Sequence, residues 1–229
     1  TVTMNRPDRL NVFSIPVLHE MSMTFDRLAV DEDINAVVFR STTHKVFSGG
    51  ADISSMAEHG PEEAEAFSRL GHSVALRLER ALPPTIMVCR GGILGGGLEF
   101  ALACDMRVAS DDAFFSQPEI DLGVIPGWGG TQRLTRVVGP TRAKEMIYSG
   151  RRVSATEALA MGLVNAVVPA DMVDETASEL ADVVASKGRL ALMAAKRAMN
   201  AVWDTHLHQG IGVEVENWSI LFDTGDQKE

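Results

Sequence analysis

The sequence is poor in cysteine, in positive charge and in long apolar runs. Its two cysteines, Cys89 and Cys104, stand among apolar neighbours, so we expect reduced core thiols and no disulfide framework. Lys and Arg number 21 against 31 Asp and Glu, a formal net charge of −10 at pH 7. This balance argues against a protein that binds nucleic-acid phosphates or an anionic membrane surface. No apolar run reaches the roughly 18 residues that a membrane-spanning helix requires.

Metal ligands and leader sequences are also scarce. The six histidines are scattered through the sequence. Zinc takes about three or four protein ligands, and His206 and His208 supply only two, so we expect no metal. No signal peptide is visible in the sequence, which opens at Thr1-Val2-Thr3. We therefore expect a cytoplasmic protein, or one of the mitochondrial matrix if a transit peptide precedes this sequence.

Strand and helix patterns alternate through the first three-quarters of the chain. Short apolar or β-branched runs predict strands at 2–4, 34–39, 86–89, 106–109 and 163–168. Apolar residues at helical spacing predict helices at 16–29, at 67–78 and from Thr131. The alternation indicates an α/β core over residues 1–168.

Beyond Pro169 the pattern predicts helices alone. We expect them at 171–185, 189–203 and 206–222, with alanine- and methionine-rich faces of the kind used for subunit packing. Residues 169–229 are thus predicted to form an all-α region.

Glycine is concentrated where chemistry is expected. In IMVCRGGILGGGLEFALACD (86–105), a strand breaks at glycine clusters and resumes as a helix over 98–104. Exposed backbone N–H groups at a glycine turn and a helix N-terminus suit a negatively charged oxygen. No Lys-Ser/Thr pair follows, so this is not a phosphate-binding P-loop, and the spacing does not fit a dinucleotide fingerprint. A second glycine turn, FSGGAD (47–52), can present donors in the same way.

Two carboxylates are the main candidates for acid–base chemistry. Glu99 is the only charge in its apolar helix, and Glu119 follows Pro118 in an apolar-flanked loop. A buried carboxylate with a raised pKa can act as a general acid beside an ionised neighbour that acts as a base. Alternatively, Glu99 caps backbone N–H groups and Glu119 pairs with an arginine such as Arg133.

Other polar and aromatic candidates carry weaker signals. Trp128, between two glycines, either walls a pocket or is an ordinary core residue, and Lys45 either meets a phosphate or lies on the surface. Asp52 and Asp105 are expected to cap backbone groups. No Gly-x-Ser-x-Gly nucleophile elbow is present.

Four segments, taken in order, resemble the signature blocks of the crotonase, or enoyl-CoA hydratase/isomerase, superfamily. They are KVFSGGADI (45–53), GGILGGGLEFALACDMRVAS (91–110), FSQPEIDLGVIPGWGGTQRL (115–134) and ATEALAMGLVNAVV (155–168). The resemblance runs from Asn5 to about Pro169 and is specific, because the blocks keep their order.

The resemblance implies a crotonase-like α/β fold, a spiral of ββα units with an all-α C-terminal region. It implies a homotrimer, or a homohexamer built as a dimer of trimers, whose helical region continues beyond Glu229. The substrate would be an acyl-CoA thioester, with no cofactor other than the coenzyme A that the substrate carries. The backbone N–H groups at the positions of Ala51 and Gly96 would form an oxyanion hole. Further contacts to the substrate and its coenzyme A are expected at Lys45, Ser48, Gly50, Asp52, Ile53, Gly95, Pro118, Gly127 and Trp128.

The two glutamates distinguish members of the superfamily. Hydratases have a glutamate at both matched positions, which implies addition of water to a 2-enoyl-CoA. Glu99 is then the base that activates water, and Glu119 donates the proton to Cα. The alternatives are a Δ3,Δ2-enoyl-CoA isomerase, another acyl-CoA-transforming member, and a non-enzymatic scaffold or RNA-binding homologue, which the retained glutamates and acidic balance disfavour.

Overall fold

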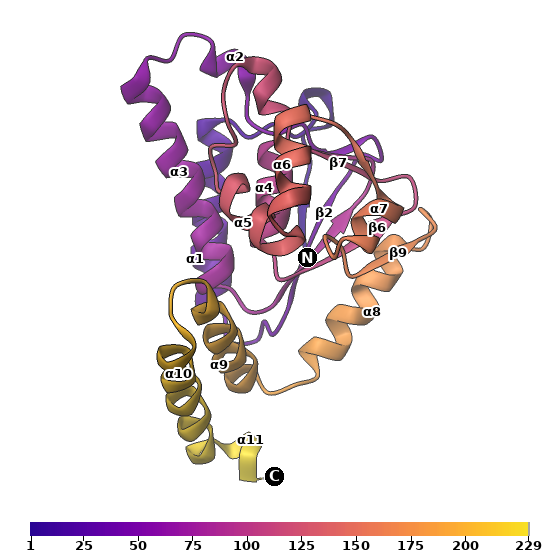
Figure 1. The fold of residues 1–229 in the computed structure, drawn as a ribbon. Coiled ribbons are helices and arrows are strands. Elements are labelled where there is room, and N and C mark those ends of the chain that lie inside the picture. The colour runs from indigo at the N-terminus through magenta and orange to yellow at the C-terminus, as the bar shows by residue number, and fades with distance from the viewer. Residues whose placement is uncertain (229) are drawn as a thin grey trace.

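The computed structural model describes residues 1–228, which form two β-sheets surrounded by helices (Figure 1). The larger sheet is parallel, with the order β1-β2-β4-β6-β9. The smaller sheet has the order β3-β5-β7-β8, and its last pair is antiparallel. The strands are β1 (Val2–Met4), β2 (Val37–Ser41), β3 (Val46–Ser48), β4 (Thr85–Cys89), β5 (Gly92–Leu94), β6 (Met106–Ser110), β7 (Phe114–Ser116), β8 (Val153–Ser154) and β9 (Ala166–Val168).

The chain alternates between the sheets in a regular way. A strand of the larger sheet is followed by a strand of the smaller sheet and then by helix, as in β2-β3-α2-α3 and β4-β5-α4. Successive units lie side by side because β2 pairs with β4 and β3 with β5. The expected crotonase-like spiral of ββα units is therefore confirmed.

Helices cover the sheets and join the units. In Figure 1, α1 and α3 run along one flank of the core, and α5 and α6 lie in front of it. The helices before residue 170 are α1 (Ile15–Val30), α2 (Ile53–Met56), α3 (Pro61–Arg80), α4 (Gly96–Ala103), α5 (Gly130–Val138), α6 (Pro140–Ser149) and α7 (Ala155–Ala160), with 3-10 turns η1 (Pro7–Arg9) and η2 (Pro118–Leu122).

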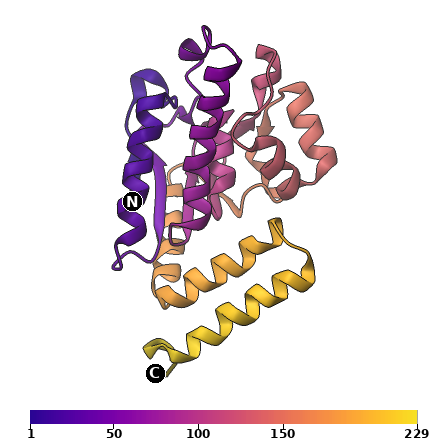
Figure 2. The same ribbon diagram turned by 90° about the vertical axis from the view of Figure 1, so that its left-hand side faces the viewer.

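After β9 the described chain is helical. The helices are α8 (Val173–Ala185), α9 (Arg189–Asn200), α10 (Leu207–Ile220) and α11 (Gly225–Lys228), with 3-10 turns η3 (Ala201–Trp203) and η4 (Leu221–Asp223). Figure 2 shows α9 and α10 as a pair that extends away from the sheets. None of the helices formed by residues 1–228 is long and apolar enough to cross a membrane.

The core contains a strand, β4, that is buried on both faces. Every residue of β4 is buried, as expected for a central parallel strand with covering layers on each side. Cys89 and Cys104 are unpaired and buried, as the sequence predicts, and burial raises the pKa of both thiols.

Three local expectations require correction. The strand expected at 34–39 is β2, Val37–Ser41, because Ile34 and Asn35 instead bind the helical region: the Ile34 carbonyl accepts from Arg189, and the Asn35 amide donates to the Ala185 carbonyl. The first residues of the glycine turn expected at 47–52 belong to the buried strand β3. The break at 90–97 contains β5, where Gly92 makes room for the ring of Phe114.

Candidate active site

A cavity of about 310 Å³ opens between α3, α4 and the segment from η2 to α5. It is bordered by both glycine turns and both glutamates that the sequence singles out. Ten of the predicted site residues line it: Gly50, Ala51, Ile53, Gly95, Gly96, Glu99, Pro118, Glu119, Gly127 and Trp128.

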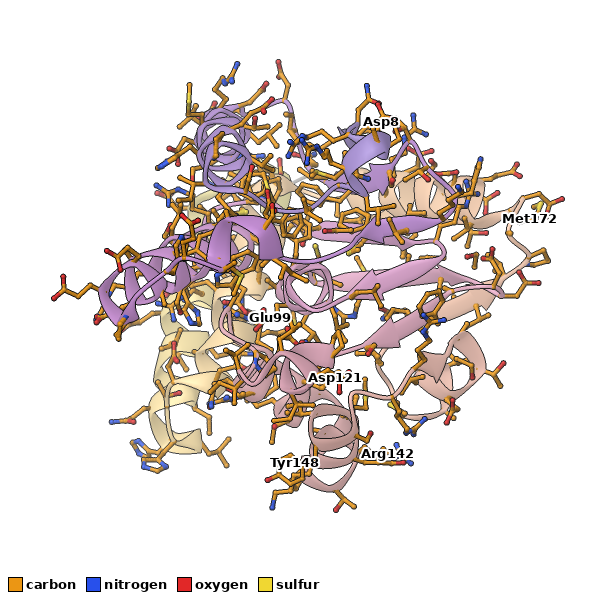
Figure 3. All side chains as sticks on the ribbon, turned by 90° about the horizontal axis from the view of Figure 1, so that it is seen from above. Asp8, Glu99, Asp121, Arg142, Tyr148 and Met172 are labelled. Atoms are coloured by element: carbon orange, nitrogen blue, oxygen red, sulfur yellow. The ribbon has the colours of Figure 1, made fainter. Side chains whose placement is uncertain are left out.

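Glu99 projects from the first turn of α4 and is 2% exposed. Figure 3 shows it in the interior of the molecule, while Asp8, Tyr148 and Met172 lie at the edge. Its Oε1 accepts hydrogen bonds from the backbone N–H groups of Trp128 and Gly130, both at 2.7 Å. Glu99 therefore binds backbone donors, as one alternative expected, and also faces the cavity.

The electrostatics of Glu99 are a balance of opposing effects. Burial raises the pKa of this carboxyl group, because charge is costly away from water. The two N–H groups and the positive charge of Arg133 act in the opposite direction. Glu99 is thus a buried carboxyl group whose ionised form has dedicated partners.

Glu119 lies in the 3-10 turn η2, which Pro118 begins. Burial, and next the charge of Glu99, raise the pKa of Glu119 to about 7. The buried amide of Gln117 donates to both carboxylate oxygens, at 2.8 and 2.9 Å, when it is oriented to satisfy its neighbours. Glu119 can therefore hold or release a proton near neutral pH.

The N–H group of Ala51 is left free by the way its neighbours pair. Gly50 and Asp52 both bind Phe13: the Phe13 N–H donates to the Gly50 carbonyl at 2.8 Å, and the Asp52 N–H donates to the Phe13 carbonyl at 3.1 Å. In a parallel bridge the residue between these two points its own N–H the other way. Within residues 1–228 the Ala51 N–H has no hydrogen-bond acceptor.

Gly96 presents a second free donor close by. It is the first residue of α4, so its N–H has no carbonyl in the helix to bind, and no other acceptor among the described residues takes it. A Cβ added to Gly96 would lie 3.3 Å from the Ala51 nitrogen, and one added to Gly50 would lie 3.1 Å from the Gly96 nitrogen. Glycine thus lets the two backbone turns approach each other at the cavity wall.

Trp128 is both a core residue and a cavity wall. It is 6% exposed, and its ring meets that of Phe67 edge to face at a centroid distance of 5.1 Å. The indole lies directly over Gly71 and Gly96, where any Cβ would overlap it. Both readings of the sequence therefore hold for this residue.

Three predicted contact residues do not line the cavity. Ser48 is fully buried and holds the donor turn, since its Oγ donates to the Asn11 carbonyl and accepts from Gly50 N–H. Asp52 caps α2 by accepting from the Ser54 N–H. Lys45 is exposed at the start of β3.

The suggested pairing of Arg133 with Glu119 is wrong. Arg133 instead binds Glu79 of α3 through two hydrogen bonds of 2.6 and 2.9 Å. The expected backbone cap at Asp105 is confirmed, because its Oδ2 accepts from the Thr85 N–H at 2.7 Å.

Sequence reasoning missed the apolar wall of the cavity and the partner of Glu119. Gln117 stands next to Pro118 and Glu119 in the sequence. Only the tertiary structure shows that its amide is buried beside the Glu119 carboxyl group. Apolar wall residues come from α2, α3, the end of η2 and the segment that follows it: Met56, Phe67, Leu122, Val124 and Ile125. No group of three or more His, Cys, Asp or Glu side chains within residues 1–228 has the geometry to hold a metal ion.

A ββα spiral that places two carboxyl groups beside two free backbone N–H donors defines the crotonase-like class of proteins, and this chain has that arrangement. A sequence model of the enoyl-CoA hydratase/isomerase family matches residues 1–229. The chain is 40% identical over 228 residues to a short-chain-enoyl-CoA hydratase of Clostridium acetobutylicum, covering 100% of this chain and 87% of that protein. It is 36% identical over 226 residues to a crotonyl-CoA hydratase of Syntrophomonas wolfei, covering 99% and 87%.

Solved structures agree with the sequence comparison. The crystal structure of an enoyl-CoA hydratase from Bacillus anthracis matches with a TM-score of 0.95 at 35% identity, covering 99% of this chain and 88% of that one. Pseudomonas aeruginosa DspI matches with a TM-score of 0.95 at 33% identity, covering 99% and 86%. The chain belongs to the enoyl-CoA hydratase/isomerase family, and the resemblance found in its sequence blocks is confirmed.

Proposed function

We propose that this protein is an enoyl-CoA hydratase, a hydro-lyase that reversibly adds water to a 2-enoyl-CoA to give a 3-hydroxyacyl-CoA. The observation that carries the proposal is the pair of carboxyl groups at one cavity, Glu99 and Glu119, beside two free backbone donors. The relatives named short-chain-enoyl-CoA and crotonyl-CoA hydratase support the same reaction.

The N–H groups of Ala51 and Gly96 form the oxyanion hole. As water adds to Cβ, electrons move to the thioester oxygen, which becomes an enolate oxygen with increasing negative charge. Donors that lack a protein partner can bind that oxygen more strongly in the transition state than in the ground state. Losing one such donor costs about 10²–10³ in rate.

Glu99 and Glu119 handle the two protons of the reaction. Glu99, with its Oε1 bound to two N–H groups, takes a proton from water as the oxygen attacks Cβ. Glu119, whose pKa is raised to about 7, delivers its proton to Cα. In dehydration the roles reverse. No cofactor takes part; coenzyme A belongs to the substrate.

The apolar walls receive the acyl chain, and the coenzyme A portion extends toward the surface. Lys45 or a neighbouring subunit supplies positive charge for the phosphates of coenzyme A. Residues 1–168 carry the site, while residues 169–229 assemble a homotrimer or homohexamer. We place the reaction in the cytoplasm.

Conversion of crotonyl-CoA tests the proposal. The absorbance of the enoyl-thioester band falls when water adds across the double bond, and a panel of enoyl-CoA chain lengths and branches extends the assay. Glu99→Gln and Glu119→Gln should each lower kcat by about 10²–10⁴ without unfolding the protein. Asp121→Asn is the matched control, because this exposed carboxylate shares η2 with Glu119 but lies outside the cavity.

Absence of absorbance change with every substrate, or near-normal turnover by either glutamine variant, would contradict the assignment. Conversion of a 3-enoyl-CoA to its 2-enoyl isomer without hydration would instead indicate the isomerase.

A further inference from the structure

The guanidinium of Arg133 lies outside the cavity and binds two different elements. Its Nε and Nη2 donate to the two carboxylate oxygens of Glu79, at 2.6 and 2.9 Å. Its Nη1 donates to the backbone carbonyl of Trp128 at 2.8 Å. Three donors in one plane are thus matched to three acceptors, an arrangement that the guanidinium group allows and the ammonium group of lysine does not.

The backbone that Arg133 binds is also the backbone that binds Glu99. Trp128 donates its N–H to Glu99 Oε1 while its carbonyl accepts from Arg133. Gly130, two residues on, donates the second N–H to the same oxygen. The Trp128–Gly130 loop is therefore held from the cavity side by Glu99 and from the outer side by Arg133.

Gly129 shows how closely the arginine approaches this loop. Its φ is +108°, which favours glycine, and any Cβ at this position would overlap Nη1 of Arg133. The loop conformation and the position of the guanidinium group therefore depend on each other.

We propose that the Glu79–Arg133 pair positions Glu99 by fixing the orientation of the Trp128 and Gly130 N–H groups. This inference rests on the proposed hydratase function and assigns that reaction two positioning residues outside the cavity. Neither is among the residues that line the cavity.

The pair is largely buried. The side chains of Arg133 and Glu79 are 14% and 24% exposed, so removing either leaves the other in a mostly buried position without its ion-pair partner. His72 of α3 also faces this region, and burial and next the charge of Arg133 lower its pKa. Arg136 lies one turn further along α5, bound within its own helix to Gln132.

The test compares Arg133→Lys and Glu79→Gln with Arg136→Lys, the control on the same helix. If the pair positions Glu99, the first two variants should lower kcat for crotonyl-CoA roughly 10- to 100-fold, because misplacing a reacting group by about 1 Å has effects of this size. KM should stay within about threefold, since the cavity walls and the donors at Ala51 and Gly96 remain. Arg136→Lys should leave both constants unchanged.

A double-mutant cycle separates positioning from general destabilisation. In Glu99→Asp the shorter side chain no longer reaches both N–H groups. If the proposal holds, adding Arg133→Lys to this variant should lower its kcat by less than about threefold. An equal loss in the wild-type and Glu99→Asp backgrounds would overturn the proposal, as would an unchanged kcat in Arg133→Lys. If Arg133→Lys does not fold, Glu79→Gln, which keeps the side-chain volume, carries the same cycle. Wild-type inactivity on every enoyl-CoA would instead overturn the proposed function.

Discussion

Glu99 and Glu119 line one cavity but are held by different partners. Burial raises the pKa of both carboxyl groups, but two backbone N–H groups counteract this for Glu99, whereas the negative charge of Glu99 raises the pKa of Glu119 further. When the pair carries a single proton, that proton therefore belongs mainly on Glu119. This distribution is the one that hydration requires, with a base facing water and an acid facing Cα.

The pH dependence of hydration follows from this singly protonated pair. We expect kcat/KM for crotonyl-CoA to fall as the pH rises above about 7, because the proton then leaves Glu119. The two carboxyl groups titrate as a coupled pair, so the pKa read from the rate profile belongs to the pair and not to one residue. Initial rates measured across pH 5–10, in buffers of constant ionic strength, check this expectation. Well above the pKa, kcat/KM should fall roughly tenfold per pH unit.

The reverse reaction supplies an internal control. Hydration consumes no net proton, so its equilibrium constant does not vary with pH, and kcat/KM for dehydration must follow the same curve. A flat profile up to pH 9, with an active enzyme, would contradict the raised pKa of Glu119.

At the scale of elements, a buried lysine is one of the groups that join the helical region to the spiral. Lys196 of α9 is 4% exposed, and its Nζ donates to Asp105 Oδ2 and to the Leu78 carbonyl, both at 2.7 Å. The same Asp105 oxygen accepts from the N–H of Thr85, the first residue of β4. Lys196 thus connects α9 to α3, to β4 and to the turn before β6.

Replacing this lysine should loosen α9. Lys196→Met leaves the Asp105 carboxylate without its cation, and breaking one side of a buried ion pair costs about 3–5 kcal/mol. We expect the free energy of unfolding, measured by urea denaturation, to fall by this amount. The exposed neighbour Arg197, changed to Met, should alter it by no more than about 0.5 kcal/mol. Equal stability of the two variants would show that Lys196 does not hold the helix.

At the scale of the whole molecule, α10 and the following turn η4 carry an exposed apolar stripe. Five large apolar side chains recur at helical spacing and are between 47% and 81% exposed: Leu207, Ile211, Val215, Trp218 and Phe222. Figure 2 shows that α10 lies on the far side of α9 from the sheets, so the spiral cannot cover this stripe. An exposed apolar stripe of this kind marks a contact surface, which agrees with the proposed homotrimer or homohexamer.

Sedimentation velocity tests this assembly. The protein should sediment as a trimer or hexamer at micromolar concentration, and Ile211→Asp should shift it to smaller species because a charge is then buried in the contact. Gln209→Glu places a charge off the stripe and preserves the cap at His206, so it should leave the assembly unchanged. A monomeric wild-type protein, measured with the full-length chain, would refute the proposal.

The sequence by itself determined the elements whose spacing is regular. Helical spacing located α1 and α3, and buried apolar runs located β4 and β6, because periodicity directly reflects which face of an element is buried. It also identified the donor-rich turns and both glutamates. The short strands β3 and β5 escaped, because each directly adjoins a glycine cluster, which the sequence pattern favours as a turn.

Only the tertiary structure decided which groups are partnered and which are free. The Ala51 N–H is free because Phe13, 38 positions earlier, pairs with the residues on either side of it. Arg133 binds Glu79 and not Glu119 because the spiral places α3 beside α5 at that point. Residue types fix what chemistry is available, but hydrogen-bond partners distant in sequence depend on how the spiral stacks its turns.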